Sequence, residues 1–255
     1  MLPTYERLDA PKPIFRIPFG RIAFLVVSLP LGSLAFCVVW SVWFDFARST
    51  YTHCDVPNYL PSISAAIGNY QPQKSVWRLA IFLHLPARIA VAKMYLEHYR
   101  DKIRRNRRMF AYVACMLNVV EDFALFSLSL WTSADNYDIH RNAFIVFIVC
   151  SELYMLISYF LNKNGRKVSI LLPIEEKSLR YKRNLFLLNV LAFCLAGYCF
   201  LRHNERCEPG VYTLFALFEY VVVLTNMGYH MTAYWDFIAL NITFDWQKGL
   251  YLSQT

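Results

Sequence analysis

The chain has 255 residues, of which 57% are hydrophobic and only 17% are charged. An ordinary soluble domain carries about 25% charged residues, so this composition argues against a soluble enzyme. It also argues against a nucleic-acid partner despite the formal net charge of +8, because in a membrane protein the location of charge matters more than its sum. The apolar residues are grouped in long blocks, which predicts a polytopic membrane protein.

Six of these blocks are long enough to cross a bilayer, which takes about 20 residues. We therefore expect an all-α protein, a six-transmembrane-helix bundle at 22–237, between an N-terminal segment 1–21 and a tail 238–255. The connection between the first two spans contains three prolines, which argue against one continuous helix. The predicted spans are 22–46, 76–99, 109–132, 142–161, 185–201 and 211–235.

An even number of spans places both termini on the same side of the membrane. The terminal segments and the loops 100–108 and 163–183 together carry 18 of the 26 Lys and Arg residues. The three opposite loops, 47–75, 134–141 and 202–210, carry five. Because basic loops stay in the cytosol, we expect cytosolic termini and lumenal opposite loops.

Two of the seven cysteines, Cys54 and Cys207, fall in the predicted lumenal loops. An oxidising compartment allows them to pair as a disulfide. The alternative is two free thiols. The other five cysteines lie in apolar spans, where cysteine packs as a small hydrophobic residue.

Polar and ionisable residues are concentrated inside three of the predicted spans. Such residues are costly in a membrane and usually face protein or water. Glu219, Asn226 and His230 are spaced seven and four apart, so they share one stripe of the sixth helix. The depths of the residues allow Arg88 and Arg78 to be neutralised by carboxylates. The carboxylates in reach are Glu121, Asp122 and Glu219, and Glu152 and Lys93 are further possible partners.

These groups allow a structural and a functional interpretation. In the structural one, ion pairs hold the helices in register, His84 is a core histidine, and His230 and Asp236 cap a helix or reach the cytosolic surface. In the functional one, His84 is a general base for acyl transfer, oriented by Glu121 or Glu219. The candidate lipid-binding residues are then Arg78, Arg88, Asn118, Asn226, His230, and the lumenal His53, Arg202 and His203.

Sequence motifs for other chemistries are missing. The chain contains no Gly-rich phosphate loop, no C-x-x-C pair, no zinc-type ligand spacing and no nucleophile elbow. We therefore expect no cofactor and no metal, and no motif demonstrates catalysis.

Several longer stretches resemble the post-GPI attachment to proteins factor 2 family, within the wider Frag/DRAM/Sfk-type membrane proteins. They are HCDVPNYLPS at 53–62, the Trp77-Arg78…His84…Arg88 pattern, N-x-x-E at 118–121 and NAFIVFI at 142–148. The resemblance covers about residues 20–237, whereas the loop 163–183 and the tail match no motif, so a principal member and a factor 2-like paralogue both remain open.

The resemblance implies an integral protein of Golgi and endoplasmic reticulum membranes that acts in fatty-acid reacylation of lyso-GPI. Its partners would be membrane lipids, the GPI lipid of GPI-anchored proteins, and other GPI-remodelling membrane proteins. Whether the protein catalyses the transfer or assists it stays open. The alternatives are a non-catalytic lipid-binding scaffold and a DRAM-like lysosomal or autophagy regulator.

Overall fold

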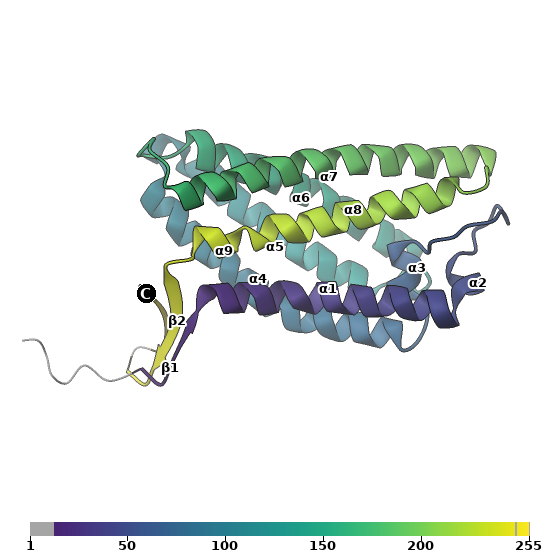
Figure 1. Cartoon of the computed structure of the whole chain (residues 1–255), viewed down its shortest axis with the longest axis horizontal. Coiled ribbons are helices and arrows are strands. Elements are labelled where there is room, and N and C mark those ends of the chain that lie inside the picture. The colour runs from purple at the N-terminus through teal and green to yellow at the C-terminus, as the bar shows by residue number, and fades with distance from the viewer. Residues whose placement is uncertain (1–12, 248, 255) are drawn as a thin grey trace, which may run out of the picture.

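Six long helices form the body of the protein in the computed structural model, which describes residues 13–247 and 249–254 (Figure 1). Each helix contains a stretch long and apolar enough to cross a membrane, so the predicted six-helix bundle is confirmed. The helices are α1 (Phe19–Phe44), α4 (Gln73–Lys102), α5 (Arg108–Leu130), α6 (Tyr137–Asn164), α7 (Pro173–Arg206) and α8 (Val211–Met231).

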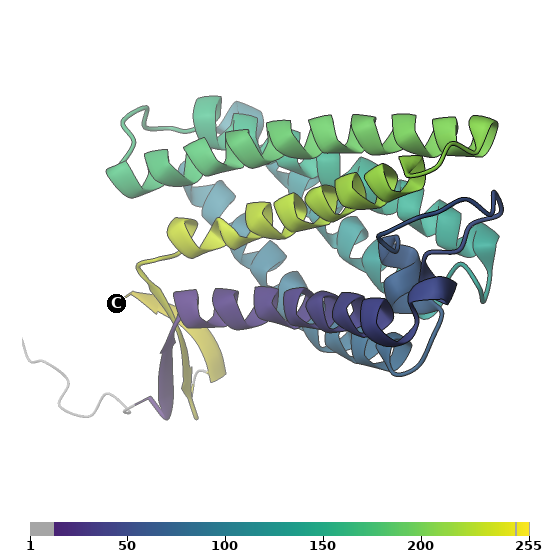
Figure 2. The ribbon, with the colours of Figure 1, turned by 45° about the vertical axis from the view of Figure 1, so that its right-hand side comes forward.

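The six helices are arranged as a closed ring in which neighbours in sequence are neighbours in space. α1 packs on α4, and the order continues through α5, α6, α7 and α8. The ring closes where α8 contacts α1, and both views show α8 between α7 and α1 (Figures 1 and 2). All six helices can therefore contribute side chains to one shared interior.

Small residues lie where the helices contact one another, while large apolar residues face the outer surface of the bundle. Ala192 of α7 is buried in one cluster with Val222 of α8, and Ala114 of α5 is buried with Tyr95 of α4. Leu191 on the outer side of α7 is 57% exposed. This pattern is typical of membrane bundles, where close packing rather than burial from water drives helix association.

One end of the bundle, called the sheet end here, carries a small antiparallel sheet. Its strands are β1 (Phe15–Pro18), β2 (Leu240–Asp245) and β3 (Gly249–Gln254), in the order β1-β2-β3. Strands β2 and β3 follow a short helix α9 (Ala233–Asp236), and the sheet adds a β element to the predicted all-α fold. The sheet pairs part of the predicted N-terminal segment, 1–21, with part of the predicted tail, 238–255; residues 1–12 of the first and residues 248 and 255 of the second lie outside the described residues.

The opposite end, called the loop end, contains two short helices, α2 (Phe46–Ser49) and α3 (Ile63–Gly68). The prediction of a broken connection here is confirmed, because these helices cover only part of it. At the sheet end a single 3-10 turn, η1 (Arg105–Arg107), links α4 to α5.

Helix α7 is longer than its predicted span and begins inside the predicted basic loop. Pro173 occupies the first position, and Glu175 accepts a hydrogen bond from the backbone N–H of Leu172 at 3.1 Å. Proline and acidic residues both favour a helix N-terminus. Hydropathy misses this extension because the added turns are charged.

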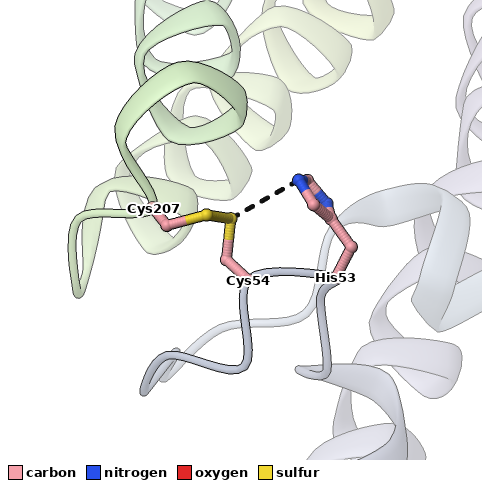
Figure 3. Close-up of side chains that lie close together, drawn as sticks. All are labelled: His53, Cys54 and Cys207. Atoms are coloured by element: carbon pink, nitrogen blue, oxygen red, sulfur yellow. Dashed lines mark hydrogen bonds between the residues drawn. A yellow bond between two sulfur atoms is a disulfide. The ribbon is translucent and has the colours of Figure 1, made fainter.

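A disulfide between Cys54 and Cys207 confirms the predicted pairing (Figure 3). The two Cα atoms lie 5.2 Å apart, and the bond joins the connection before α3 to the end of α7 across 153 positions. His53 lies beside it, with its Nε2 atom 3.4 Å from the Cys54 sulfur. The ligand atoms of these three residues lie within 4.8 Å of one another, but the bonded sulfurs are not available as thiolate ligands.

We expect loss of this disulfide to destabilise the protein. Chain-entropy arguments assign typically about 2–4 kcal/mol to a disulfide, and more to long loops. Cys54→Ser, Cys207→Ser and the double variant should therefore melt at a similarly lowered temperature in detergent. Cys194→Ser, which changes an exposed free thiol, is the control. A double variant as stable as the parent protein would contradict a stabilising role.

Candidate functional site

The bundle interior contains a set of polar side chains, here called the central polar cluster. Its cation is Arg88 of α4, whose Nη2 atom lies 2.8 Å from Oδ1 of Asp122 and 3.8 Å from Oε1 of Glu121. The same Nη2 donates a hydrogen bond to Oδ1 of Asn118 at 2.9 Å. The cluster consists of Arg88, Asn118, Glu121, Asp122, Asn226 and His230.

Helix α8 joins this cluster through two residues of its predicted polar stripe. The Nδ2 atom of Asn226 donates to Oε1 of Glu121 at 2.9 Å and to the Ser151 hydroxyl at 2.6 Å. Nε2 of His230 lies 3.0 Å from the same Glu121 oxygen, and its ring stacks on Tyr154. The interpretation of His230 as a capping or surface-reaching residue is therefore wrong, because the side chain is buried among polar partners.

The charges of the central polar cluster leave no surplus positive charge for a phosphate. One guanidinium group, that of Arg88, faces the carboxylates of both Glu121 and Asp122. Nε2 of His230 lies 3.0 Å from Arg88 as well as from Glu121. It can accept from the arginine or donate to the carboxylate, but one ring nitrogen cannot do both. The cluster is thus suited to holding helices together more than to binding an anion.

Arg78, the second predicted phosphate ligand, lies away from this cluster. Its side chain pairs with Asp135 at 3.0 Å and donates to the backbone carbonyls of Ser129 and Leu130. The prediction that Glu121, Asp122 or Glu219 neutralises Arg78 is wrong. A hydrogen bond from Lys74 lowers the pKa of Asp135 from 3.8 to about 2. This carboxylate therefore stays charged and fastens the turn between α5 and α6 to α4.

His84 is oriented by the backbone and not by a carboxylate. Its Nδ1–H donates to the carbonyl oxygen of Val26 on α1 at 2.9 Å, which leaves Nε2 as the unprotonated nitrogen of the neutral ring. The prediction that Glu121 or Glu219 orients His84 is wrong. Glu219 instead accepts a hydrogen bond from the backbone N–H of Ile63 in α3 at 2.8 Å. It therefore holds the loop end in place.

The three loop residues predicted to bind lipid on the lumenal side, His53, Arg202 and His203, have local partners. Arg202 donates two hydrogen bonds to Glu208, at 2.6 and 3.0 Å, and these hold the pKa of Glu208 below its usual value. His203 is fully buried, and its Nε2 lies 3.1 Å from the Thr52 hydroxyl. His53, exposed beside the disulfide, packs edge-on against His203. None of these three residues lines the internal cavity of the bundle.

A second ion pair lies near the sheet end. Nζ of Lys182 on α7 is 2.5 Å from Oδ2 of Asp236 on α9, and the same carboxylate accepts hydrogen bonds from Ser178 and Tyr95. Both charged residues are buried, so the interpretation of Asp236 as a cap or surface-reaching residue is wrong. The pair ties α7 and α9 to α4.

A cavity of about 590 Å³ extends from the central polar cluster to the loop end. Its volume lies within the range of roughly 300–1,000 Å³ that is usual for small-molecule sites. Most of its wall is apolar, with contributions from Trp77, Phe147 and Phe215 among others. The polar residues that line it are Tyr51, Ser62, Ser64, Asn69, Ser133, Tyr137, His140, Arg141, Tyr212 and Glu219 toward the loop end, and His84, Arg88, Glu121, Asn226 and His230 deeper inside.

Two residues of the cavity wall that were not predicted from the sequence form a close pair. The hydroxyl of Ser64 on α3 lies 3.1 Å from Nε2 of His140 on α6. The residues are 76 positions apart, and neither belongs to a local motif. Only the tertiary structure brings them together, so no sequence signal was available to find them.

Taken together, the fold and this cavity define a multi-pass membrane protein with an amphipathic internal site. The Frag1/DRAM/Sfk1/Cwh43P N-terminal domain family matches residues 18–240, and the chain belongs to this family. No solved structure matches the chain.

Several named relatives are similar to the chain over most or all of its length. It is 72% identical to "Post-GPI attachment to proteins factor 2" of Drosophila pseudoobscura pseudoobscura over 100% of both chains. It is 43% identical to "Acyltransferase PGAP2" of Xenopus tropicalis, over 88% of this chain and 89% of that one. Identity with a "Post-GPI attachment to proteins factor 2-like" protein of Drosophila melanogaster is 32%, over 86% of this chain and 69% of that protein. The similarity is thus stronger to the factor 2 proteins than to this factor 2-like protein.

We expect Arg88→Ala to lower the stability of the purified protein strongly. Removing one partner of a buried ion pair typically costs about 3–5 kcal/mol, because the other charge stays buried without compensation. Arg88→Met combined with Asp122→Leu should lose less than Arg88→Ala alone. Thermal unfolding in detergent measures all three proteins.

Arg78→Ala is the matched control, since its ion pair with Asp135 is partly exposed to solvent and such pairs contribute little to stability. If Arg78→Ala and Arg88→Ala lowered the thermal stability equally, the central polar cluster would contribute no more to stability than a partly exposed ion pair.

Proposed function

We propose that this protein acts in GPI-anchor lipid remodelling, as an acyltransferase that adds a fatty acid to the lyso-GPI lipid. The observation that carries the proposal is the cavity of about 590 Å³, which combines apolar walls with a polar lining at the loop end. A lipid needs both surfaces, one for its acyl chain and one for its headgroup. The names of relatives at 72% and 43% identity support the same reaction.

We further propose that the lipid reaches the cavity from the side, between α6 and α7. Gly197 lines the cavity and is also exposed on α7. It shares a helix face with Cys194 and Leu201, three and four positions away, which are exposed on the outer surface. A Cβ atom built at Gly197 would meet nothing within 4 Å, so space is open there. A chain from the surrounding lipid could enter without unfolding a helix.

Arg141 is the better placed of the two arginines that line the cavity to contact a phosphate. Arg88 already faces two carboxylates in the bundle interior. Arg141 lies at the loop end, is about half exposed, and has one ion pair, with Asp138 at 3.1 Å. We propose that it holds the headgroup phosphate, a role for which an arginine side chain is well suited. His84 stays a candidate base deeper in the same cavity.

A non-catalytic scaffold is the second candidate function. It is favoured by the central polar cluster and the Lys182–Asp236 pair, whose charges all have structural partners. A DRAM-like lysosomal regulator has less support, because the relatives at 72% identity carry the factor 2 name.

The lateral route predicts that Gly197→Trp blocks remodelling without unfolding the protein. In cells lacking the endogenous activity, the parent chain should restore reacylated lipid on a GPI-anchored reporter, measured by mass spectrometry, and Gly197→Trp should reduce it at least about tenfold. Gly32→Trp is the matched control, since Gly32 is an exposed helical glycine with equally open space and does not line the cavity. A parent chain that restores nothing would contradict the proposed function; full activity of Gly197→Trp would contradict the route alone.

We also propose a Golgi and endoplasmic reticulum location with both termini in the cytosol. The disulfide at the loop end supports this orientation, since disulfides persist on the oxidising side of such membranes. The most basic loops lie at the sheet end, in agreement with the positive-inside rule.

The orientation predicts how two epitope tags respond to selective permeabilisation of the plasma membrane. A tag after Thr255 should become accessible to antibody while the Golgi membrane stays sealed. A tag inserted after Pro209, in the turn between α7 and α8, should become accessible only after the internal membranes are opened. The reverse pattern would place the termini in the lumen.

A further inference from the structure

The pair formed by Ser64 and His140 has the geometry of a nucleophile and its base. Nδ1–H of His140 donates to the carbonyl oxygen of Trp131 at 2.9 Å. This contact fixes the tautomer, so the lone pair of Nε2 points at the Ser64 hydroxyl, 3.1 Å away. A hydroxyl, a histidine and a group that orients the histidine are the three parts of an activated serine nucleophile. Here a backbone carbonyl takes the place of the usual carboxylate.

Both residues are held by contacts from several helices. The Ser62 hydroxyl caps α3 by accepting from the N–H of Ala65, and Glu219 accepts from the N–H of Ile63. The hydroxyl of Tyr220 donates to the carbonyl of Pro61 at 3.0 Å. These bonds fix α3, and therefore Ser64, against α8.

The turn that orients His140 is fixed in the same way. Asp135 accepts from the hydroxyl of Thr132 and pairs with Lys74 and Arg78 of α4. Thr132 also packs closely on α3, since a Cβ atom built at Gly68 would lie only 3.0 Å from the Cβ atom of Thr132. Two residues selected from the sequence as ligands or catalytic groups, Arg78 and Glu219, thus position the dyad from either side.

Comparison with His84 shows what is particular to His140. Both histidines line the cavity, and both donate Nδ1–H to a backbone carbonyl at 2.9 Å. Of these two histidines, His140 has a hydroxyl within hydrogen-bond distance of its Nε2, whereas Nε2 of His84 makes no hydrogen bond to the described residues. Both histidines are buried, and Ser64, the partner of His140, is partly exposed in the cavity.

We propose that Ser64 and His140 form a catalytic dyad that carries the acyl group between donor and acceptor lipids. This inference rests on the proposed acyl transfer and assigns its residues. The donor class is an acyl ester of a membrane glycerophospholipid, because most of the cavity wall is apolar and one lining residue, Gly197, is exposed on α7. Ser64 Oγ attacks the ester carbonyl, its proton moves to Nε2 of His140, and the C–O bond to the donor breaks as that proton passes to the departing lipid alkoxide.

The second half of the reaction reverses these steps with a different lipid. The free hydroxyl of lyso-GPI loses its proton to Nε2 of His140 and attacks the acyl carbonyl on Ser64. The bond between that carbonyl and Oγ breaks, and the proton returns to Ser64. The net reaction exchanges one ester for another, so it needs no further reactant.

The test uses an alkyl fluorophosphonate probe on the full chain, purified in detergent, together with the cellular reacylation assay. We expect the probe to modify Ser64 of the parent protein, as mapped by mass spectrometry. Ser64→Ala should abolish labelling, and His140→Gln should reduce it at least about 100-fold, in keeping with loss of a general base. Both variants should lose reacylation to a similar extent. Ser75→Ala, at an exposed serine of α4 whose hydroxyl donates to Gln71, should keep labelling and activity.

The outcomes separate this dyad from the proposed function. If the parent chain restores reacylation and folded Ser64→Ala restores it equally, the dyad is wrong and the function stands. If Ser64 is labelled in a His140-dependent way but the parent chain restores nothing, the dyad stands and the function is wrong. If the probe leaves Ser64 of the parent protein unmodified, the dyad is overturned even where the variants do not fold. Loss of labelling in His84→Gln and not in His140→Gln would move the base to His84.

Discussion

The ion pair between Arg88 and Asp122 is the contact on which the packing of this bundle depends. A charge inside a membrane is costly unless it is neutralised, and both partners are almost fully buried 2.8 Å apart. Because lipid is as apolar as a leucine side chain, the hydrophobic effect does not select one arrangement of helices, and polar contacts can. Glu121 extends the pairing to Asn226 and His230, so one cluster fixes α4, α5 and α8 relative to one another.

This neutralisation also decides where chemistry can take place in the cavity. The one guanidinium group of the central polar cluster already faces two carboxylates, so the cluster has no free positive charge for the phosphate of a substrate. Toward the loop end, Ser64 and Arg141 are at least partly exposed, and the disulfide between Cys54 and Cys207 braces the neighbouring connection. The interior cluster then supplies rigidity, while the loop end supplies reactive groups on fixed backbone.

The parts of the structure that the sequence predicted are those encoded by local pattern. The six spans follow from hydropathy, the inward direction of Asn226 and His230 from helical spacing, and the disulfide from topology and compartment. The sheet between β1 and β2 could not be predicted, since it pairs segments more than 200 positions apart. The depth of a residue along its helix did not predict its partners. Depth placed Arg78 and Glu219 near the right level of the bundle but not beside their actual neighbours. The reason is that depth specifies neither the rotation of a helix about its axis nor the path of a loop.

The orientation of His84 and His140 shows why a search for catalytic residues from sequence goes wrong in a membrane cavity. Such a search looks for a carboxylate beside each histidine, as in soluble hydrolases. In a low-dielectric interior, each added carboxylate carries a burial penalty that must be offset by another cation. A backbone carbonyl fixes the tautomer of an imidazole without adding a charge, and both histidines use one. Since every residue has a carbonyl, no residue type marks this arrangement, and what distinguishes His140 from His84 is the hydroxyl of Ser64 within reach of its second nitrogen.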